Sequence, residues 1–418
     1  MLTPETYVYI RIFIVVNYKK PFILKIFEAK DSMTITSENL TTTTHTRLYG
    51  LDHLRALAIT LVFIYHYGHV FPSPEWITGI SKFGWTGVDL FFVLSGYLIS
   101  SQLFAIIDKG KNISFKTFFI KRFFRIIPAY LLVVAIYFCF PASRERSAPA
   151  PLWKYLSFTQ NIGLDLRTQG TFSHAWSLCI EEQFYLLLPL TLIALVYAKA
   201  IKKGIALLVT LFVLGMAARW YIYDNVVLAR FNEENSWINW YKWIYYPTYG
   251  RLDGLLTGVG IGALFQFRPM IKEKLTGYGN LLLAGSLVVL TVAYFLCITE
   301  DSFNASVFGF PLVSIGYGLL LMGAISPNCL LYRFKSGITA RLAALSYAIY
   351  LTHKIIIHLM QGQSGKLNIA KNGVWMFLIC TIACVAAAYC MNFLIEKPFL
   401  KWRDKILNTR LQESTANK

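Results

Sequence analysis

One polar pair inside an apolar stretch limits the possible folds most strongly. Arg55 and His66 both lie within residues 51–70, a stretch long enough to span the core of a bilayer. Each polar group costs a few kcal/mol in such a segment, so both are candidates for function. Eleven helical steps of about 100° return to nearly the same face, with a rise of roughly 16 Å, so both can line one polar path. The alternative is that Arg55 snorkels at a helix end and a neighbouring helix satisfies His66.

The composition is that of a polytopic membrane protein. Hydrophobic residues make up 56% of the 418 residues and charged residues only 15%, with a mean hydropathy of +0.50; a soluble domain has about a quarter charged residues. The net charge of +18 could suggest nucleic-acid binding, but the basic residues lie between apolar runs, where they act as topology signals. We therefore expect no nucleic-acid partner. The seven Cys lack paired zinc spacing, so neither a metal site nor a disulfide framework is expected.

Ten apolar runs approach or reach the length of a membrane span. We therefore predict an all-α polytopic membrane protein with about ten transmembrane helices. The runs cover approximately residues 51–70, 85–107, 126–141, 178–199, 204–223, 245–267, 280–298, 307–325, 342–360 and 374–395.

The distribution of Lys and Arg predicts the orientation. If the N-terminus is cytoplasmic, the inward connections and the tail hold about twice as many basic residues as the outward connections. Both termini are therefore predicted to be cytoplasmic. We expect a membrane domain over residues 48–403 and a basic cytoplasmic tail over 404–418.

Residues 1–47 differ from the rest and are predicted to be an N-terminal extension. The apolar stretch 7–16 is too short to span a membrane, contains Arg11 and lacks a signal-peptide cleavage site. Met33 precedes a polar run, so we expect Met33 to be the natural start and residues 1–32 an upstream extension. An interfacial helix is the competing interpretation.

With this orientation, several polar residues within the apolar runs fall at one depth, in the outer half of the membrane. Converging polar groups in a membrane usually mark a substrate or proton site. Besides His66, these residues are Asp89, Glu181, Arg251, Asp253 and His353.

Each of these residues also has a structural interpretation. Asp89 can cap a helix N-terminus. Ser177 and Glu181 share one helix face with Tyr185, which suits either a site or a polar seam. Arg251 and Asp253, two positions apart, point to different faces and can pair with other helices. His353 and the neighbouring Lys354 can be packing or snorkelling residues.

A basic pair faces the opposite surface. Arg122 and Arg125 lie one helical turn apart at the predicted cytoplasmic side, and guanidinium groups suit phosphate oxygens. Positive-inside topology alone can also produce such a pair.

Taken together and in this order, the motifs resemble acyltransferase family 3, the integral membrane O-acyltransferases. The resemblance covers about residues 48–403. Its pieces are Leu54-Arg55…Tyr65-His66, Gly87-Val-Asp89-Leu-Phe-Phe-Val-Leu-Ser-Gly-Tyr-Leu98, Arg122-x-x-Arg125 followed by Ile127-Pro128, His174-x-Trp176-Ser177-Leu-x-x-Glu181-Glu-Gln-Phe-Tyr185, Arg251-Leu-Asp253-Gly254, Leu345-Ser-Tyr-x-x-Tyr-Leu-x-His353 and Glu396-Lys-Pro-Phe399.

The resemblance implies ten membrane helices in the cytoplasmic (inner) membrane. It also implies transfer of an acyl group, expected to be acetyl, from cytoplasmic acyl-CoA to a hydroxyl of an extracytoplasmic glycan or glycolipid. Thr352 and Lys354 replace the aromatic residues usual beside the His at position 353, which puts that residue's family role in question. The partners expected are acyl-CoA, the acceptor and membrane lipid; the sequence does not define an oligomeric state.

The chemistry assigns a role to each candidate. A base must take the hydroxyl proton, and His66 has a suitable unperturbed pKa; Glu181 or Asp89 would orient it as catalytic partners. Arg122 and Arg125 would hold the CoA phosphates, and Arg55 would guide the pantetheine arm or offset the carbonyl charge. Whether the histidine acts as base or is itself acylated stays open. The candidate substrate-binding residues are Trp176, Ser177, Arg251, Asp253 and His353.

Two other classes of protein also fit an intramembrane polar site. A transporter or flippase of a polysaccharide or lipid-linked substrate usually has related halves or broken helices, and the sequence has no convincing repeat. A non-catalytic membrane sensor would not need the arginine pair beneath a histidine and carboxylate cluster.

Overall fold

The computed structural model describes residues 48–230 and 237–416, with side chains described up to residue 409. The predicted extension and the Met33 start lie outside the described residues. Within the described part the chain is helical, and the only strand-like feature is an isolated bridge between Pro149 and Thr171. The all-α prediction is therefore confirmed.

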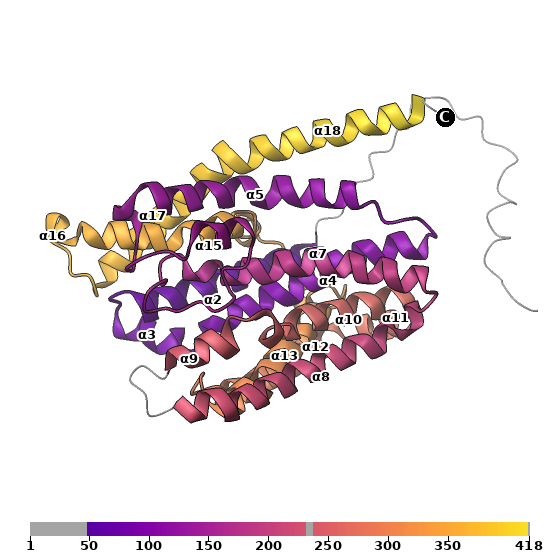
Figure 1. The fold of residues 1–418 in the computed structure, drawn as a ribbon, viewed down its shortest axis with the longest axis horizontal. Coiled ribbons are helices and arrows are strands. Elements are labelled where there is room, and N and C mark those ends of the chain that lie inside the picture. Colours follow the sequence, from indigo (N-terminus) through magenta and orange to yellow (C-terminus); the bar gives the residue numbers. More distant parts are fainter. Residues whose placement is uncertain (1–47, 231–236, 417–418) are drawn as a thin grey trace, which may run out of the picture. The chain divides into compact units, whose positions relative to one another are not determined.

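Long helices run side by side (Figure 1). They are α2 (Tyr49–Val70), α4 (Gly87–Asp108), α5 (Phe115–Cys139), α7 (Trp176–Tyr197), α8 (Gly204–Ile222), α10 (Asp253–Phe267), α12 (Gly279–Leu296), α13 (Phe310–Ala324), α15 (Gly337–Gly362) and α17 (Val374–Met391). Shorter or peripheral helices are α3 (Glu75–Ser81), α6 (Leu152–Leu156), α9 (Trp237–Trp240), α11 (Pro269–Gly277), α14 (Leu330–Arg333), α16 (Ser364–Leu367) and α18 (Lys397–Ala416), which includes part of the predicted tail.

Length and composition identify the helices that can cross a membrane. In the described part of the chain, eight helices qualify, and nine if α10 and α11, bent by 110°, form one span. The chain is therefore a multi-pass membrane protein. The predicted first span, α2, is 22 residues long but is not among the eight, because polar residues such as Asp52, His53 and Arg55 lower its hydropathy. Of these three residues, Arg55 lines a cavity.

Two predicted runs have different boundaries in the structure. The run 126–141 is the second half of α5, which begins at Phe115 and continues through Pro128. The run 245–267 is not one helix: a π-turn, Tyr241–Tyr245, and a 3-10 turn, Thr248–Gly250, precede α10. Pro247 lies between these turns and has no N–H to continue a helix. The expectation that one spanning helix covers 245–267 and carries Arg251 and Asp253 in its interior is therefore wrong; Arg251 precedes α10 and Asp253 begins it.

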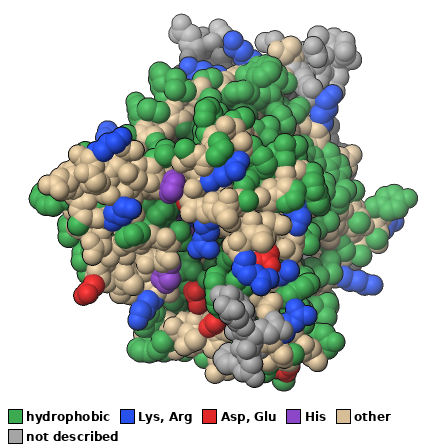
Figure 2. Space-filling model, turned by 60° about the vertical axis from the view of Figure 1, so that its left-hand side comes forward, with side chains coloured by type: hydrophobic (Ala, Val, Ile, Leu, Met, Phe, Trp, Pro, Cys, Tyr) green, Lys and Arg blue, Asp and Glu red, His purple; other side chains and the backbone are tan. Residues whose placement is uncertain are grey.

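The helix bundle has two ends, and different connections lie at each end. One end, which we call the α9 end, carries α3, α9 and α16, and the opposite end, the α11 end, carries α11 (Figure 1). The connections 140–172 and 297–304 belong to the α9 end. In Figure 2, charged and histidine side chains gather on the face turned forward, with hydrophobic side chains around them.

The contact between α4 and α10 is close because glycines line it. A Cβ at Gly96 would lie 2.2 Å from the Leu255 carbonyl oxygen, and one at Gly258 would lie 2.3 Å from that of Val93. Small residues let membrane helices approach to backbone contact. At the α9 end of this contact, Gly254 approaches the backbone oxygen of Asp89 in the same way.

Candidate active site

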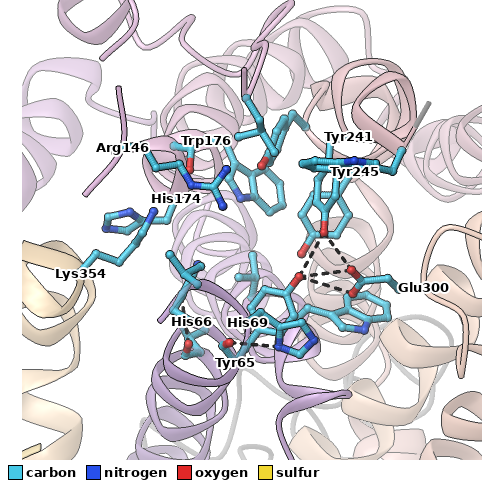
Figure 3. Close-up of a pocket in the computed structure, with 18 of the residues that line it drawn as sticks. Tyr65, His66, His69, Arg146, His174, Trp176, Tyr241, Tyr245, Glu300 and Lys354 are labelled. Atoms are coloured by element: carbon cyan, nitrogen blue, oxygen red, sulfur yellow. Dashed lines mark hydrogen bonds between the residues drawn. The ribbon is translucent and has the colours of Figure 1, made fainter. Parts of the chain in front are cut away.

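The larger cavity lies at the α9 end and has a volume of about 360 Å³. We call it the histidine cavity. Helices α2 and α15 contribute His66 and Lys354, and the 3-10 turn Ser173–Ala175 before α7 contributes His174. The 140–172 connection contributes Arg146 (Figure 3). Trp176 also lines it, as do several tyrosines and Glu300. The α2 candidate histidine is therefore accessible from this cavity.

Three histidines meet at this cavity. The ring centroids of His66 and His353 lie 4.9 Å apart, those of His174 and His353 also 4.9 Å, and those of His66 and His174 5.6 Å. His353 is fully buried, so the snorkelling interpretation does not apply to it. His174 is 2% exposed, and neither of its ring nitrogens has a hydrogen-bond partner. A ligand in the cavity can therefore supply the missing partner of His174.

Backbone carbonyls determine the protonation of the two bonded rings. Nδ1 of His353 lies 3.0 Å from the Ile349 oxygen and 2.9 Å from the Tyr350 oxygen. Because carbonyls only accept, this Nδ1 carries the proton, and Nε2 of the neutral ring is an acceptor. Nδ1 of His66 lies 3.0 Å from the Val62 oxygen and 3.1 Å from Nε2 of His353, so it donates. Nε2 of His66 then keeps its lone pair, which is the form a general base requires.

Lys354 is buried in an ion pair and does not snorkel. Its Nζ lies 2.7 Å from Oε1 of Glu145, and the two side chains are 2% and 0% exposed. Burial opposes ionisation of Glu145, but the ammonium of Lys354 and the N–H of Phe172 stabilise the carboxylate, so the pKa of Glu145 is below its usual value. The pair therefore ties the 140–172 connection to α15 beside the histidines.

The smaller cavity, about 180 Å³, is lined by Arg55, Arg122 and Arg125, and we call it the arginine cavity. Gln102, close to the α11 end of α4, also lines it. The guanidinium of Arg122 lies 5.2 Å from the centre of the Tyr185 ring, which holds it by a cation–π contact. Fork-shaped donors of this kind suit the oxygens of a phosphate or a carbonyl.

Glu181 belongs to the arginine cavity, not to the histidines. Its Oε1 accepts a hydrogen bond of 2.8 Å from Ser95, and its Oε2 accepts one of 3.0 Å from Tyr185. Ser177, four residues earlier on α7, lines the same cavity. The structure therefore does not bring Glu181 to His66; His353 occupies the position expected of the orienting carboxylate.

Asp89, Arg251 and Asp253 lie behind the cavities in two buried ion pairs. Arg251 donates to Asp89 at 2.9 and 3.0 Å, and Arg219 of α8 donates to Asp253 at 2.7 and 3.1 Å. The Arg251 guanidinium also lies 5.5 Å from the ring centre of Trp176. Arg251 and Asp253 therefore pair with residues of other helices, as the structural interpretation of these two residues expected. The Arg251 contact also holds Trp176 in the wall of the histidine cavity.

Tyr350 lines both cavities. Its hydroxyl lies 2.6 Å from the Ser177 hydroxyl and donates to the carbonyl oxygen of His174. The two cavities therefore meet at this side chain, with His66 on one side of it and Arg55 on the other.

The sequence interpretation missed several groups that line these cavities, including His174, Tyr350, Arg146 and Glu300. His174 opens a motif that was recognised, but it was not selected as a site residue. Tyr350 carries no charge to distinguish it from the other tyrosines of an aromatic-rich chain. Arg146 and Glu300 lie in connections where no periodic pattern indicates a direction. Among the described residues, no group of three or more His, Cys, Asp or Glu is arranged to hold a metal ion.

Two cavities that meet inside a helical membrane bundle, one lined by histidines and one by arginines, are the arrangement that a membrane group-transfer enzyme requires. Residues 48–393 match the family described as "Acyltransferase domain", and the chain belongs to this family. The resemblance to acyltransferase family 3 is therefore confirmed.

The curated relatives that the chain resembles are named as O-acetyltransferases. O-acetyltransferase OatA of Staphylococcus aureus (strain NCTC 8325 / PS 47) is 29% identical over 343 residues, which is 76% of this chain and 52% of that protein. The putative O-acetyltransferase SACOL0978 of Staphylococcus aureus (strain COL) is 30% identical over 386 residues, 86% of this chain and 58% of that protein. The chain thus spans a little over half the length of these relatives. No solved structure matches it.

Proposed function

We propose that the chain is an O-acetyltransferase that moves an acetyl group from cytoplasmic acetyl-CoA to a hydroxyl of an extracytoplasmic glycan or glycolipid. The observation that carries the proposal is the pair of cavities that meet at Tyr350, one lined by arginines and one by histidines. The names of the curated relatives support acetyl as the group transferred.

The donor binds in the arginine cavity. Arg122 and Arg125 hold CoA phosphate oxygens near the α11 end, and Arg55 lies along the path of the pantetheine arm. Because guanidinium donors match phosphate geometry, each lost contact would weaken donor binding rather than chemistry. The excess of basic residues in the α11-end connections supports a cytoplasmic location for this end of the cytoplasmic-membrane protein.

The reaction takes place where the cavities meet. Nε2 of His66 removes the proton of the acceptor hydroxyl, and the oxygen attacks the thioester carbonyl. A C–O bond forms, the C–S bond breaks, and the proton passes from the imidazolium to the CoA thiolate. The His353 ring accepts the Nδ1–H of His66, so it orients the base and stabilises its charged form. Arg55, which lines the arginine cavity, offsets the charge that develops on the carbonyl oxygen.

A labelling experiment tests the proposal. Purified protein is incubated with [14C]acetyl-CoA and envelope glycan whose ester-linked acetate has been removed by mild alkali. We expect alkali-labile label on the glycan together with free CoA. Movement of the glycan across a vesicle membrane without labelling would instead indicate the transporter alternative.

A further inference from the structure

The histidine cavity has a second polar wall on which the proposed chemistry does not depend. Tyr241 donates to Oε1 of Glu300 at 2.8 Å. The Tyr65 hydroxyl lies 3.2 Å from that of Tyr241 and 3.4 Å from each carboxylate oxygen. We call these three residues the carboxylate wall; it faces Arg146, His174 and Lys354 across the cavity (Figure 3).

Three separate segments build this wall. Tyr65 comes from α2, Tyr241 from the π-turn Tyr241–Tyr245, and Glu300 from the connection between α12 and the π-turn Ala305–Gly309. Within the described residues no Lys or Arg forms an ion pair with Glu300, so tyrosine hydroxyls hold it in place of a cation. Burial raises the pKa of Glu300, and the hydrogen bond from Tyr241 opposes that rise.

The carboxylate retains unused acceptor capacity. Oε2 has only the long 3.4 Å contact from Tyr65, although a carboxylate oxygen can accept two hydrogen bonds. On the opposite wall, buried His174 has no partner at either ring nitrogen. Both walls therefore have polar groups available to a ligand that carries several hydroxyls.

Aromatic rings complete the cavity. Trp85, Trp176 and Tyr245 line it between the two polar walls. Flat apolar faces with a few fixed polar groups suit a ring that has apolar faces and hydroxyls at its edge, as a sugar has. The Tyr65 ring centroid is 5.5 Å from that of His66, so a sugar bound to this wall lies beside the base.

We propose that Glu300, held by Tyr65 and Tyr241, is a specificity-determining residue that accepts a hydrogen bond from a sugar hydroxyl of the acceptor. This contact turns a neighbouring hydroxyl toward Nε2 of His66. Because Asp301, the next residue in the chain, also lines the cavity, the sugar presents hydroxyls to Glu300 and not a carboxylate or phosphate. The proposal rests on the proposed function.

The test is acceptor kinetics with the de-O-acetylated envelope glycan and [14C]acetyl-CoA. Glu300→Gln and Glu300→Ala should raise the acceptor KM by about 10- to 100-fold, the range expected when a hydrogen bond to a charged group is lost. The KM for acetyl-CoA and the rate of thioester hydrolysis should stay within twofold, which also shows that the variants are folded. Tyr241→Phe should raise the acceptor KM by a few-fold, because the carboxylate is then less firmly held.

Glu273→Gln is the matched control: it removes the same charge from an exposed position on α11, and its kinetics should not change. Acceptor KM values within twofold of wild type in both Glu300 variants would overturn the proposal. A lower KM in Glu300→Gln would do so too, because it would mean that the acceptor presents an anion to this wall. A parallel loss of thioester hydrolysis would assign Glu300 a structural role. If the wild-type protein does not label the glycan, the proposed function itself fails.

Discussion

Nδ1 of His66 lies 3.1 Å from Nε2 of His353, and backbone carbonyls at Nδ1 of His353 determine which nitrogen of each ring carries the proton. With both imidazoles neutral, Nδ1 of His66 donates to His353, and the lone pair on Nε2 of His66 stays available. In this arrangement His353 acts through His66 and is a positioning residue.

Replacing His353 should therefore impair catalysis without weakening donor binding. We expect His353→Ala to lower kcat by about 10- to 100-fold, because the tautomer and orientation of His66 are no longer fixed. His353→Gln, which retains an acceptor, should recover part of the loss. Steady-state kinetics with acetyl-CoA would measure both, and His358→Ala on the same helix is the control. Equal kcat values for His353→Ala and wild type would remove the relay from the mechanism.

Removing one charge of the buried Lys354–Glu145 pair should destabilise the protein more than removing both charges. Lys354→Met or Glu145→Gln alone should each lower the free energy of unfolding by about 3–5 kcal/mol, because one charged partner stays buried. The double variant should regain most of that loss. Thermal unfolding in detergent measures this loss, with Asp165→Asn as the control. Asp165 pairs with the exposed Arg167 and, at 3.9 Å, with Lys242, so we expect a loss of less than about 1 kcal/mol.

The same pair predicts a pH dependence. Since the folded-state pKa of Glu145 is depressed, its stabilisation is present above the unfolded-state pKa, for which the reference value is 4.5, and is lost as the pH falls through the lower folded value. Wild-type protein should therefore lose stability as the pH falls below about 4.5, and the double variant should lose less. The same acid sensitivity in both proteins would show that other carboxylates govern it.

Tyr350 should control leakage between the cavities. Tyr350→Ala removes the ring at which they meet, so water from the histidine cavity should reach the thioester. We expect acetyl-CoA hydrolysis to rise relative to transfer, whereas Tyr350→Phe, which keeps the ring, should change this ratio less. The ratio of free acetate to glycan-bound acetate measures hydrolysis relative to transfer. If Tyr350→Ala leaves this ratio unchanged, the two cavities do not meet at this residue.

The sidedness of the donor site is open to chemical labelling. A Cys introduced at Ser147, in an α9-end connection, should react with an impermeant maleimide in intact cells, and one at Lys111 should react only after lysis. The opposite pattern would place the arginine cavity outside, away from cytoplasmic acetyl-CoA.

Local sequence patterns predicted what lies along single helices. Arg55 and His66 share α2, and Arg122 and Arg125 share one turn of α5, because helical spacing is a local property. Contacts between different helices were harder to predict from the sequence. The partner of His66 is 287 positions away, on α15, and among many buried polar residues nothing in spacing favours His353 over Glu181.

The residues outside the long helices were the hardest to predict. Glu145 and Glu300 lie in connections, where no periodicity indicates which way a side chain points. The sixth apolar run looked continuous because its Tyr, Leu and Phe side chains are apolar whether or not the backbone is helical. Pro247 was a local indication of a break.

The central claim is that His66 performs the chemistry and the arginine pair holds the donor. Its most direct test measures CoA affinity by calorimetry beside acetyl transfer, on wild type, His66→Ala, Arg122→Ala and Arg125→Ala. We predict that His66→Ala abolishes transfer and keeps the CoA dissociation constant within a few-fold. Each arginine variant should weaken CoA binding by about 1.5–3 kcal/mol. Near-normal turnover by His66→Ala would contradict the mechanism.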